Sequence, residues 1–333
     1  MGMSWRVLVG AVSGAVAAVI WAVSLAVYQP YMEPDGFWTD PATGETYPEI
    51  GSNNTYWPRD VRQLAILLAF VGVVIVCRAS LRAVLVAAAG AVAWAGVDLA
   101  LDRADVHSGP AAAWLAVGGA VAFAGIVGAA RKMGSGEGGS AFAGHLLATI
   151  AAVAAAVTVL ITTPWDEPVT DAADVRVENA LTLLKVGLVV MLAAGAVALL
   201  PLDRVAWMAP FAGIAALAAW PATAAYGWLG ALGLVLLPAA AAAAVAAAWD
   251  VSLPRLLGIT AACAVALIPA YLLLYFIGSS IGGAMTALAG NPAINSADTD
   301  LSLSVAAVLL GALFALISHA LARPAVREEV PVA

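Results

Sequence analysis

Long apolar runs separated by short polar segments dominate the chain. Since a helix needs about 20 mostly apolar residues to cross a bilayer, each run of that length predicts one transmembrane helix. The runs lie at 5–28, 61–77, 82–101, 110–130, 141–163, 180–200, 205–226, 228–249, 255–278 and 301–321. We therefore expect an all-α polytopic membrane protein, with about ten transmembrane helices forming a single bundle over residues 1–333.

The boundary between the seventh and eighth runs is the least distinct. Val205 to Trp249 contains no charged residue and is too long for one helix. Tyr226, Gly227 and Trp228 divide it at a position where aromatic residues suit a membrane surface. The first run is longer than the apolar region of a signal peptide, so we expect a retained first helix.

Composition supports a lipid environment for most of the chain. Hydrophobic residues make up 63% of the sequence, charged residues 11%, and the mean hydropathy is +0.97, whereas soluble domains carry about 25% charged residues. Because the lipid bilayer is the main partner, the net charge of −7 is no sign of nucleic-acid binding, and none is expected.

The basic residues predict the orientation. Lys and Arg favour the cytoplasmic side, and with ten spans and a cytoplasmic N-terminus that side receives Arg6, Arg78, Arg82, Arg131, Lys132, Arg204, Arg255, Arg323 and Arg327. The other side receives Arg59, Arg62, Arg103, Arg176 and Lys185. We therefore expect both termini inside, in the plasma membrane of a prokaryote. The Gly-rich linker 131–140 and the tail 322–333 would be cytoplasmic, and the acidic loop 164–179 extracytoplasmic.

The first outer loop, residues 29–60, is aromatic, acidic and rich in turn residues. Thr and aromatic residues flank the segment "DPATG", in which Pro and Gly are typical of a tight turn. We expect a small β-hairpin here, with Trp38 and Tyr47 on its two strands and Trp57 in an aromatic belt near the membrane surface. Such a surface suits contacts with an envelope or transporter partner protein, or with the protein's own helix ends.

Few ionisable residues fall inside the predicted spans, and each is a functional hypothesis by default. Asp98 and Lys185 lie at similar depth near the outer side, so we consider them a candidate binding pair; alternatively, each extends to the membrane surface. His145 and His319 lie near the inner ends of their spans, where interfacial water suffices to solvate them.

The sequence contains no metal motif and no phosphate-binding glycine loop. We therefore expect neither a metal nor another cofactor. The triplet Asn291-Pro292-Ala293 resembles the pore motif of aquaporins, but it occurs once and precedes a polar segment. An N-cap Asn followed by Pro at the first helical position explains it locally.

Glu33-Pro34-Asp35 follows the first predicted span on the outer side. In this layout it resembles lipid-linked sugar glycosyltransferases of the GT-C class, in which an acidic motif of the first outer loop contributes a catalytic carboxylate. The resemblance covers these residues and the topology, and it implies catalytic roles for Glu33 and Asp35.

The balance of these features favours a protein without catalytic activity of its own. We expect a permease-like transporter, or the membrane subunit of an envelope complex, with the aromatic and acidic outer loop as its cap. A GT-C-like glycosyltransferase using Glu33 and Asp35 is the alternative. In either case the many Gly and Ala residues, including Gly10 and Gly14, favour close helix packing.

Overall fold

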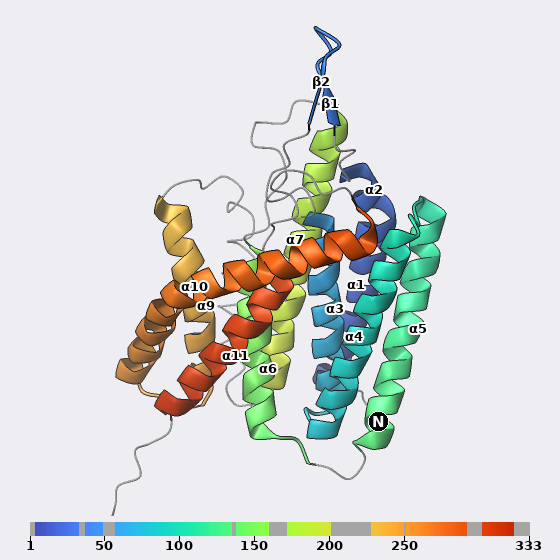
Figure 1. The fold of residues 1–333 in the computed structure, drawn as a ribbon. Helices are drawn as coiled ribbons and strands as arrows, with labels where there is room; N and C mark the ends of the chain where they lie inside the picture. Colours follow the sequence, from blue (N-terminus) through green and yellow to red (C-terminus); the bar gives the residue numbers. More distant parts are fainter. Residues whose placement is uncertain are drawn as a thin grey trace, which may run out of the picture.

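The computed structural model describes residues 4–32, 37–48, 57–134, 138–159, 172–200, 228–249, 251–291 and 302–322. These residues form helices and one small hairpin (Figure 1). In chain order the elements are α1 (Trp5–Val23), the π-helical η1 (Ser24–Tyr28), α2 (Gln29–Met32), β1 (Phe37–Thr39), β2 (Thr46–Pro48), α3 (Trp57–Val76), α4 (Leu81–Arg103), α5 (Gly109–Met133), α6 (Ala141–Thr158), α7 (Ala172–Leu199), α9 (Trp228–Ala247), α10 (Leu253–Ala289) and α11 (Leu303–Ala322).

Seven helical segments of the described chain are long and apolar enough to cross a membrane. They are Trp5–Tyr28, Leu81–Arg103, Gly109–Met133, Ala141–Thr158, Val175–Leu199, Leu253–Ala289 and Leu303–Ala322. The chain is therefore a multi-pass helical membrane protein. Helices α3 and α9 coincide with two further predicted spans, whereas the predicted span 205–226 lies outside the described residues.

Some helix ends differ from the predicted ones. Helix α7 begins at Ala172, so the second half of the predicted loop 164–179 is helical. Helix α10 continues to Ala289 rather than ending near residue 278, because Gly278, Gly282 and Gly283 do not interrupt it. Gly290 adopts a left-handed conformation with φ 82°, which is the usual end of a helix.

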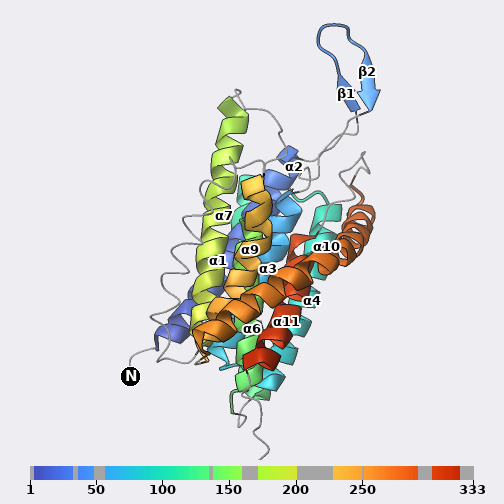
Figure 2. The same ribbon diagram turned by 90° about the vertical axis from the view of Figure 1, so that its left-hand side faces the viewer.

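The long helices α1, α3, α4, α5, α6 and α7 run side by side, and α10 crosses them obliquely (Figures 1 and 2). Helices α3 and α6 are almost entirely buried at the centre of the bundle. Helices α4, α5 and α10 instead expose large apolar side chains on their outer faces. An exposed apolar surface on spanning helices is what contact with lipid requires.

Small residues bring α1 and α3 into close contact, as the GxxxG pattern predicts. A Cβ atom added at Gly10 would lie 2.8 Å from the carbonyl oxygen of Gly72, and one added at Gly72 would lie 2.8 Å from that of Gly10. Only glycine leaves room for this approach. The contact sets the position of α3 relative to α1, and with it the position of the polar residues at the start of α3.

Strands β1 and β2 pair antiparallel in the segment for which the sequence predicts a hairpin. Trp38 is opposite Tyr47, and the Thr39 and Thr46 hydroxyls are 3.2 Å apart. The turn closes through Gly44, whose φ of 73° suits glycine and whose N–H donates to the Asp40 carbonyl. The hairpin lies at the end of the bundle opposite the start of α1 (Figure 1).

Candidate functional site

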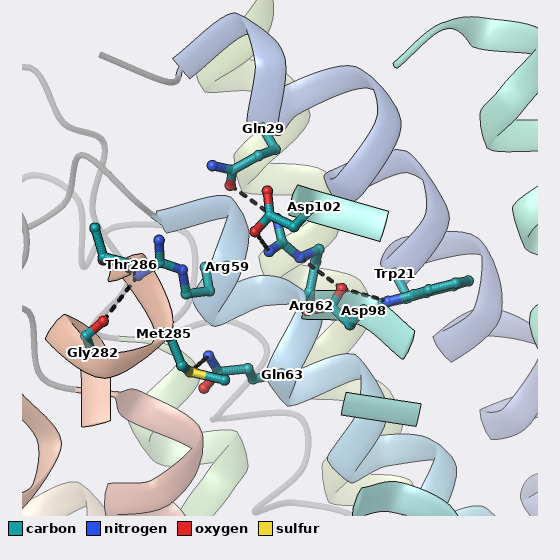
Figure 3. A network of polar contacts seen from close by, with 10 residues as sticks. All are labelled: Trp21, Gln29, Arg59, Arg62, Gln63, Asp98, Asp102, Gly282, Met285 and Thr286. Atoms are coloured by element: carbon teal, nitrogen blue, oxygen red, sulfur yellow. Dashed lines mark hydrogen bonds and ion pairs between the residues drawn. The ribbon is translucent and has the colours of Figure 1, made fainter. Parts of the chain in front are cut away.

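The first two turns of α3 carry a cluster of polar side chains inside the bundle. Arg59, Arg62 and Gln63 are all buried. Positions three and four apart share one region of a helix surface, yet the side chains here reach different neighbouring helices (Figure 3). The start of α3 therefore connects much of the bundle through polar contacts.

Arg62 is the centre of this cluster. Its Nη1 donates to Gln29 Oε1 at 2.9 Å, its Nη2 donates to Asp102 Oδ2 at 2.6 Å, and its Nε lies 2.9 Å from Asp98 Oδ1. Asp98 Oδ1 also accepts from Trp21 Nε1 at 2.7 Å. The guanidinium thus joins α1, α2, α3 and α4, as Figure 3 shows.

The arrangement follows from local helix geometry. Asp98 and Asp102 are four residues apart in α4, so both carboxylates lie on the same face and reach one guanidinium. Arginine offers donors in a planar fork, which allows it to bind two carboxylates at once. The three side chains are buried, so the two carboxylates interact with the guanidinium rather than with water.

A second set of contacts extends the cluster to α10 and α11. Arg59 Nη1 donates to Thr286 Oγ1 at 2.7 Å, and Gln63 Nε2 lies 3.0 Å from the Met285 sulfur. Gln63 Oε1 accepts from Ser302 Oγ at 2.8 Å. These contacts attach α3 to the C-terminal part of α10 and to the start of α11.

Asp60, on the same turn of α3, acts as a cap for α11. Its Oδ1 accepts from the backbone N–H of Leu303 at 3.0 Å. A carboxylate at this position satisfies one of the free N–H groups at a helix start and interacts favourably with the helix dipole. The cap is therefore supplied by a residue more than 240 positions earlier in the chain.

Asp98, predicted from its depth, belongs to the cluster, but with a different partner from the one expected. Its cationic partner in the described residues is Arg62 rather than Lys185. Lys185 is completely buried on α7, a helix that packs against α1, α3 and α6. Depth along the membrane normal does not determine which helices are neighbours, and α3 packs on α4.

The aromatic candidates fall in two places. Trp57 is 1% exposed, and the centroid of its ring lies 5.8 Å from that of Tyr28. It therefore lies inside the bundle rather than in a surface belt. Trp38 and Tyr47 face each other in the register of the hairpin. Glu33 and Asp35 lie outside the described residues.

Arg62, Asp102, Gln29 and Trp21 were not among the residues that the sequence singled out. The signal was present in part: "RDVRQ" precedes an apolar run, and Asp102 follows Asp98 by one helical turn near the outer end of the third run. The basic residues were assigned to the membrane surface, because the sequence does not say that the start of α3 is enclosed by other helices.

A separate polar contact lies near the opposite end of the bundle. His145 Nε2 and Ser318 Oγ are 2.8 Å apart, and the His145 ring packs against Trp249 and His319 with centroids 5.5 and 6.1 Å away. The buried imidazole therefore has a hydrogen-bond partner in the Ser318 hydroxyl and packs against two other rings. No group of three or more His, Cys, Asp or Glu side chains in the described residues is placed to hold a metal ion.

Comparison of the chain with known protein families, curated proteins and solved structures finds no significant match. The geometry of the Arg62 cluster and its surroundings is therefore what points to a function.

Proposed function

We propose that this protein is a permease-like transporter of the plasma membrane, without catalytic activity of its own. The observation that carries the proposal is the buried ion cluster of Arg62, Asp98 and Asp102 within a bundle of membrane-spanning helices. Placing ionisable residues at such positions costs free energy, and these residues commonly mark the path of a polar substrate or ion.

Helix packing alone gives no reason for this cluster. Backbone contacts between small residues, such as Gly10 and Gly72, already hold α1 against α3. A buried ion pair is often less stabilising than apolar side chains of similar volume. A polar substrate that enters the bundle would find here both a cation and two carboxylates with which to exchange hydrogen bonds.

The connections of α3 offer a bound substrate a route to several helices at once. Its first two turns contact α4 through Arg62, α10 through Arg59 and α11 through Asp60 and Gln63. When a substrate replaces one of these contacts, the balance among the others changes. Helix rearrangements of this kind are the basis of alternating access.

The proposal includes ten spans with both termini in the cytoplasm, for which the distribution of Lys and Arg is the support. In this orientation the hairpin of β1 and β2 is extracytoplasmic. We propose the loop 29–60 as a docking surface for an envelope protein, so that the transporter also serves as the membrane subunit of a complex.

Uptake by reconstituted vesicles tests the transport function. Purified protein in phospholipid vesicles is given a defined mixture of amino acids, sugars, nucleosides and organic acids, and the contents are measured by mass spectrometry. We expect at least one solute to accumulate with the native protein and to be lost with Asp102→Asn, which keeps the side-chain shape. Asp105→Asn, at an exposed neighbouring position, serves as the matched control and should leave uptake unchanged.

The result that contradicts transport is a folded native protein that accumulates none of these solutes and moves no protons under an imposed pH gradient. The double substitution Glu33→Gln with Asp35→Asn separates the glycosyltransferase alternative. A transporter should retain its uptake after this change, whereas transfer of a lipid-linked sugar by the native protein that the double substitution abolishes would favour the enzyme.

A further inference from the structure

The charges of the Arg62 cluster do not cancel when every member is ionised. Arg62 contributes one positive charge, whereas Asp98 and Asp102 contribute two negative charges. The Arg62 side chain is 0% exposed and each carboxylate is 2% exposed. Because an uncompensated charge is costly where water is largely excluded, the fully ionised cluster lacks one positive charge.

The helices that pack directly on α4 do not supply that charge. Besides α3, these are α5 and α10. The C-terminal end of α10 lies next to α4, since the exposed Arg103 of α4 donates to the Leu288 carbonyl. The charged residues of α5 and α10 lie at the other ends of these two helices, and they are Arg131, Lys132 and Arg255.

The other ionisable residues near the cluster do not change this balance. Arg59 and Asp60 are consecutive on α3 and carry opposite charges, so together they add no net charge. Lys185 is buried on α7, which packs against α1, α3 and α6. Among the described residues, the cation that contacts Asp98 and Asp102 is Arg62. The missing charge therefore has to be bound by the two carboxylates themselves.

A proton fits this position better than a metal cation does. A metal cation needs a shell of several oxygen ligands, whereas the carboxylates here are surrounded by N–H donors of Trp21 and Arg62. The Arg62 Nε lies 2.9 Å from Asp98 Oδ1 but is not aligned for a hydrogen bond. The aligned bond from Arg62 goes to Asp102, and a proton on the pair can be bound without breaking it.

We propose that Asp98 and Asp102 share one exchangeable proton, and that this proton is the ion coupled to transport. Two neighbouring carboxylates at a shielded site do not both ionise readily, and the proton belongs to the pair rather than to either residue. The protonated pair carries one negative charge, which Arg62 balances. The coupling rests on the proposed transport function, whereas the proton site depends on the cluster alone.

The cluster also has a short path to water. Asp102 lies in the last turn of α4, and the exposed Asp105 and His107 follow in the turn toward α5. Buried carboxylates near such a path are common in proton relays of membrane proteins. The proton can therefore exchange from this end of the bundle.

Infrared spectroscopy of the purified protein in sodium-free detergent solution tests the proton site without any substrate. A protonated carboxyl group has a band separate from that of a carboxylate, and the band shifts in D₂O when the proton exchanges. At neutral pH we expect this band in the native protein. Both Asp98→Asn and Asp102→Asn should abolish it, because either change leaves one carboxylate for one guanidinium.

Asp105→Asn, at an exposed position, is the matched control and should keep the band. The two cluster variants are independent, so one of them decides the test if the other does not fold. A native protein without the band, or a band that survives in both cluster variants, would overturn the proposal. Loss of the band in Asp60→Asn alone would place the proton elsewhere and would overturn it as well.

Uptake by vesicles under an imposed pH gradient tests the coupling. With one proton coupled to each substrate molecule, a gradient of about one pH unit supports up to about tenfold accumulation of the transported solute. We expect accumulation to follow the pH gradient and not a sodium gradient; the opposite result would overturn the coupling to protons. A protein that shows the infrared band but accumulates no solute would refute the transport function and leave the proton site intact.

Discussion

The guanidinium of Arg62 and the carboxylate of Asp102 lie 2.6 Å apart, and both side chains are buried within the helical bundle. Asp98 binds the same guanidinium from one turn earlier in α4. Two carboxylates from one helix thus share a single cation from another. This relationship makes the contact between α3 and α4 depend on charge as well as on packing.

Arg62→Met should strongly destabilise the protein, because it leaves two buried carboxylates without their cation. We expect the free energy of unfolding to fall by about 3–5 kcal/mol, as when one partner of a buried ion pair is removed. The measurement is chemical unfolding in detergent, followed by circular dichroism. Arg103→Met is the control, because Arg103 is exposed and donates to the Leu288 carbonyl. We expect this substitution to lower the free energy of unfolding by only about 0.5–1.5 kcal/mol. Equal losses for the two variants would contradict the central role of Arg62.

Trp21→Phe should lose a hydrogen bond to a charged group while keeping an aromatic ring next to Trp94. Combined with Asp98→Asn in a double-mutant cycle, it should show a coupling energy of about 1–3 kcal/mol. Unfolding midpoints of the native protein, both single variants and the double variant give this energy. Strictly additive effects would show that the contact between Trp21 and Asp98 contributes nothing of its own.

Gly72→Ala should be destabilising, because the new Cβ would lie 2.8 Å from the Gly10 carbonyl oxygen. Forcing two helix backbones apart in a packed region costs about 1–3 kcal/mol. Gly96→Ala on α4 is the matched control, since a Cβ there meets nothing within 4 Å, and it should be neutral or stabilising by up to about 1 kcal/mol. A thermal-stability series in one detergent distinguishes the two, and a stabilised Gly72→Ala would refute the close approach of α1 and α3.

His107, in the turn between α4 and α5, should have a pKa raised from the ordinary histidine value. Its Nδ1 lies 2.8 Å from the Asp105 carbonyl oxygen and 3.3 Å from the Asp105 carboxylate, and these contacts raise the pKa of the exposed imidazole. The interaction with the protonated ring is present below the pKa of an ordinary histidine and is lost as the pH rises through the raised pKa of His107.

Histidine-selective NMR in detergent measures that titration. Asp105→Asn removes the charge but keeps a residue that tolerates the left-handed backbone found at this position, where φ is 50°. We expect the pKa of His107 to fall in this variant without reaching the value of a free imidazole, because the backbone contact remains. An unchanged pKa would show that the carboxylate has no influence.

The apolar runs of the sequence predict the helices of the described chain well, because a spanning helix must be both long and apolar. The hairpin segment was equally readable, since Thr, aromatic residues, Pro and Gly occur where strands and a turn require them. Helix ends were harder to predict. Helix α7 begins before its apolar run and α10 continues beyond its own run, as far as the left-handed Gly290.

The candidate site was predicted only in part. Asp98 was identified from its depth, but its partner was not, because a sequence gives positions along the membrane normal and not the order of helices around the bundle. Trp57 was read as a surface residue, although the ends of the surrounding helices enclose it.

The sequence by itself determined that this is a multi-pass helical membrane protein, since hydrophobicity and length are properties of each segment alone. Only the tertiary structure decided that Arg59, Asp60, Arg62 and Gln63 form one polar connection between α3 and its neighbours, and that Trp21 of α1 donates to the Asp98 carboxylate of α4. The physical reason is that a buried charge selects its partners by distance and geometry, which exist only once the helices have packed.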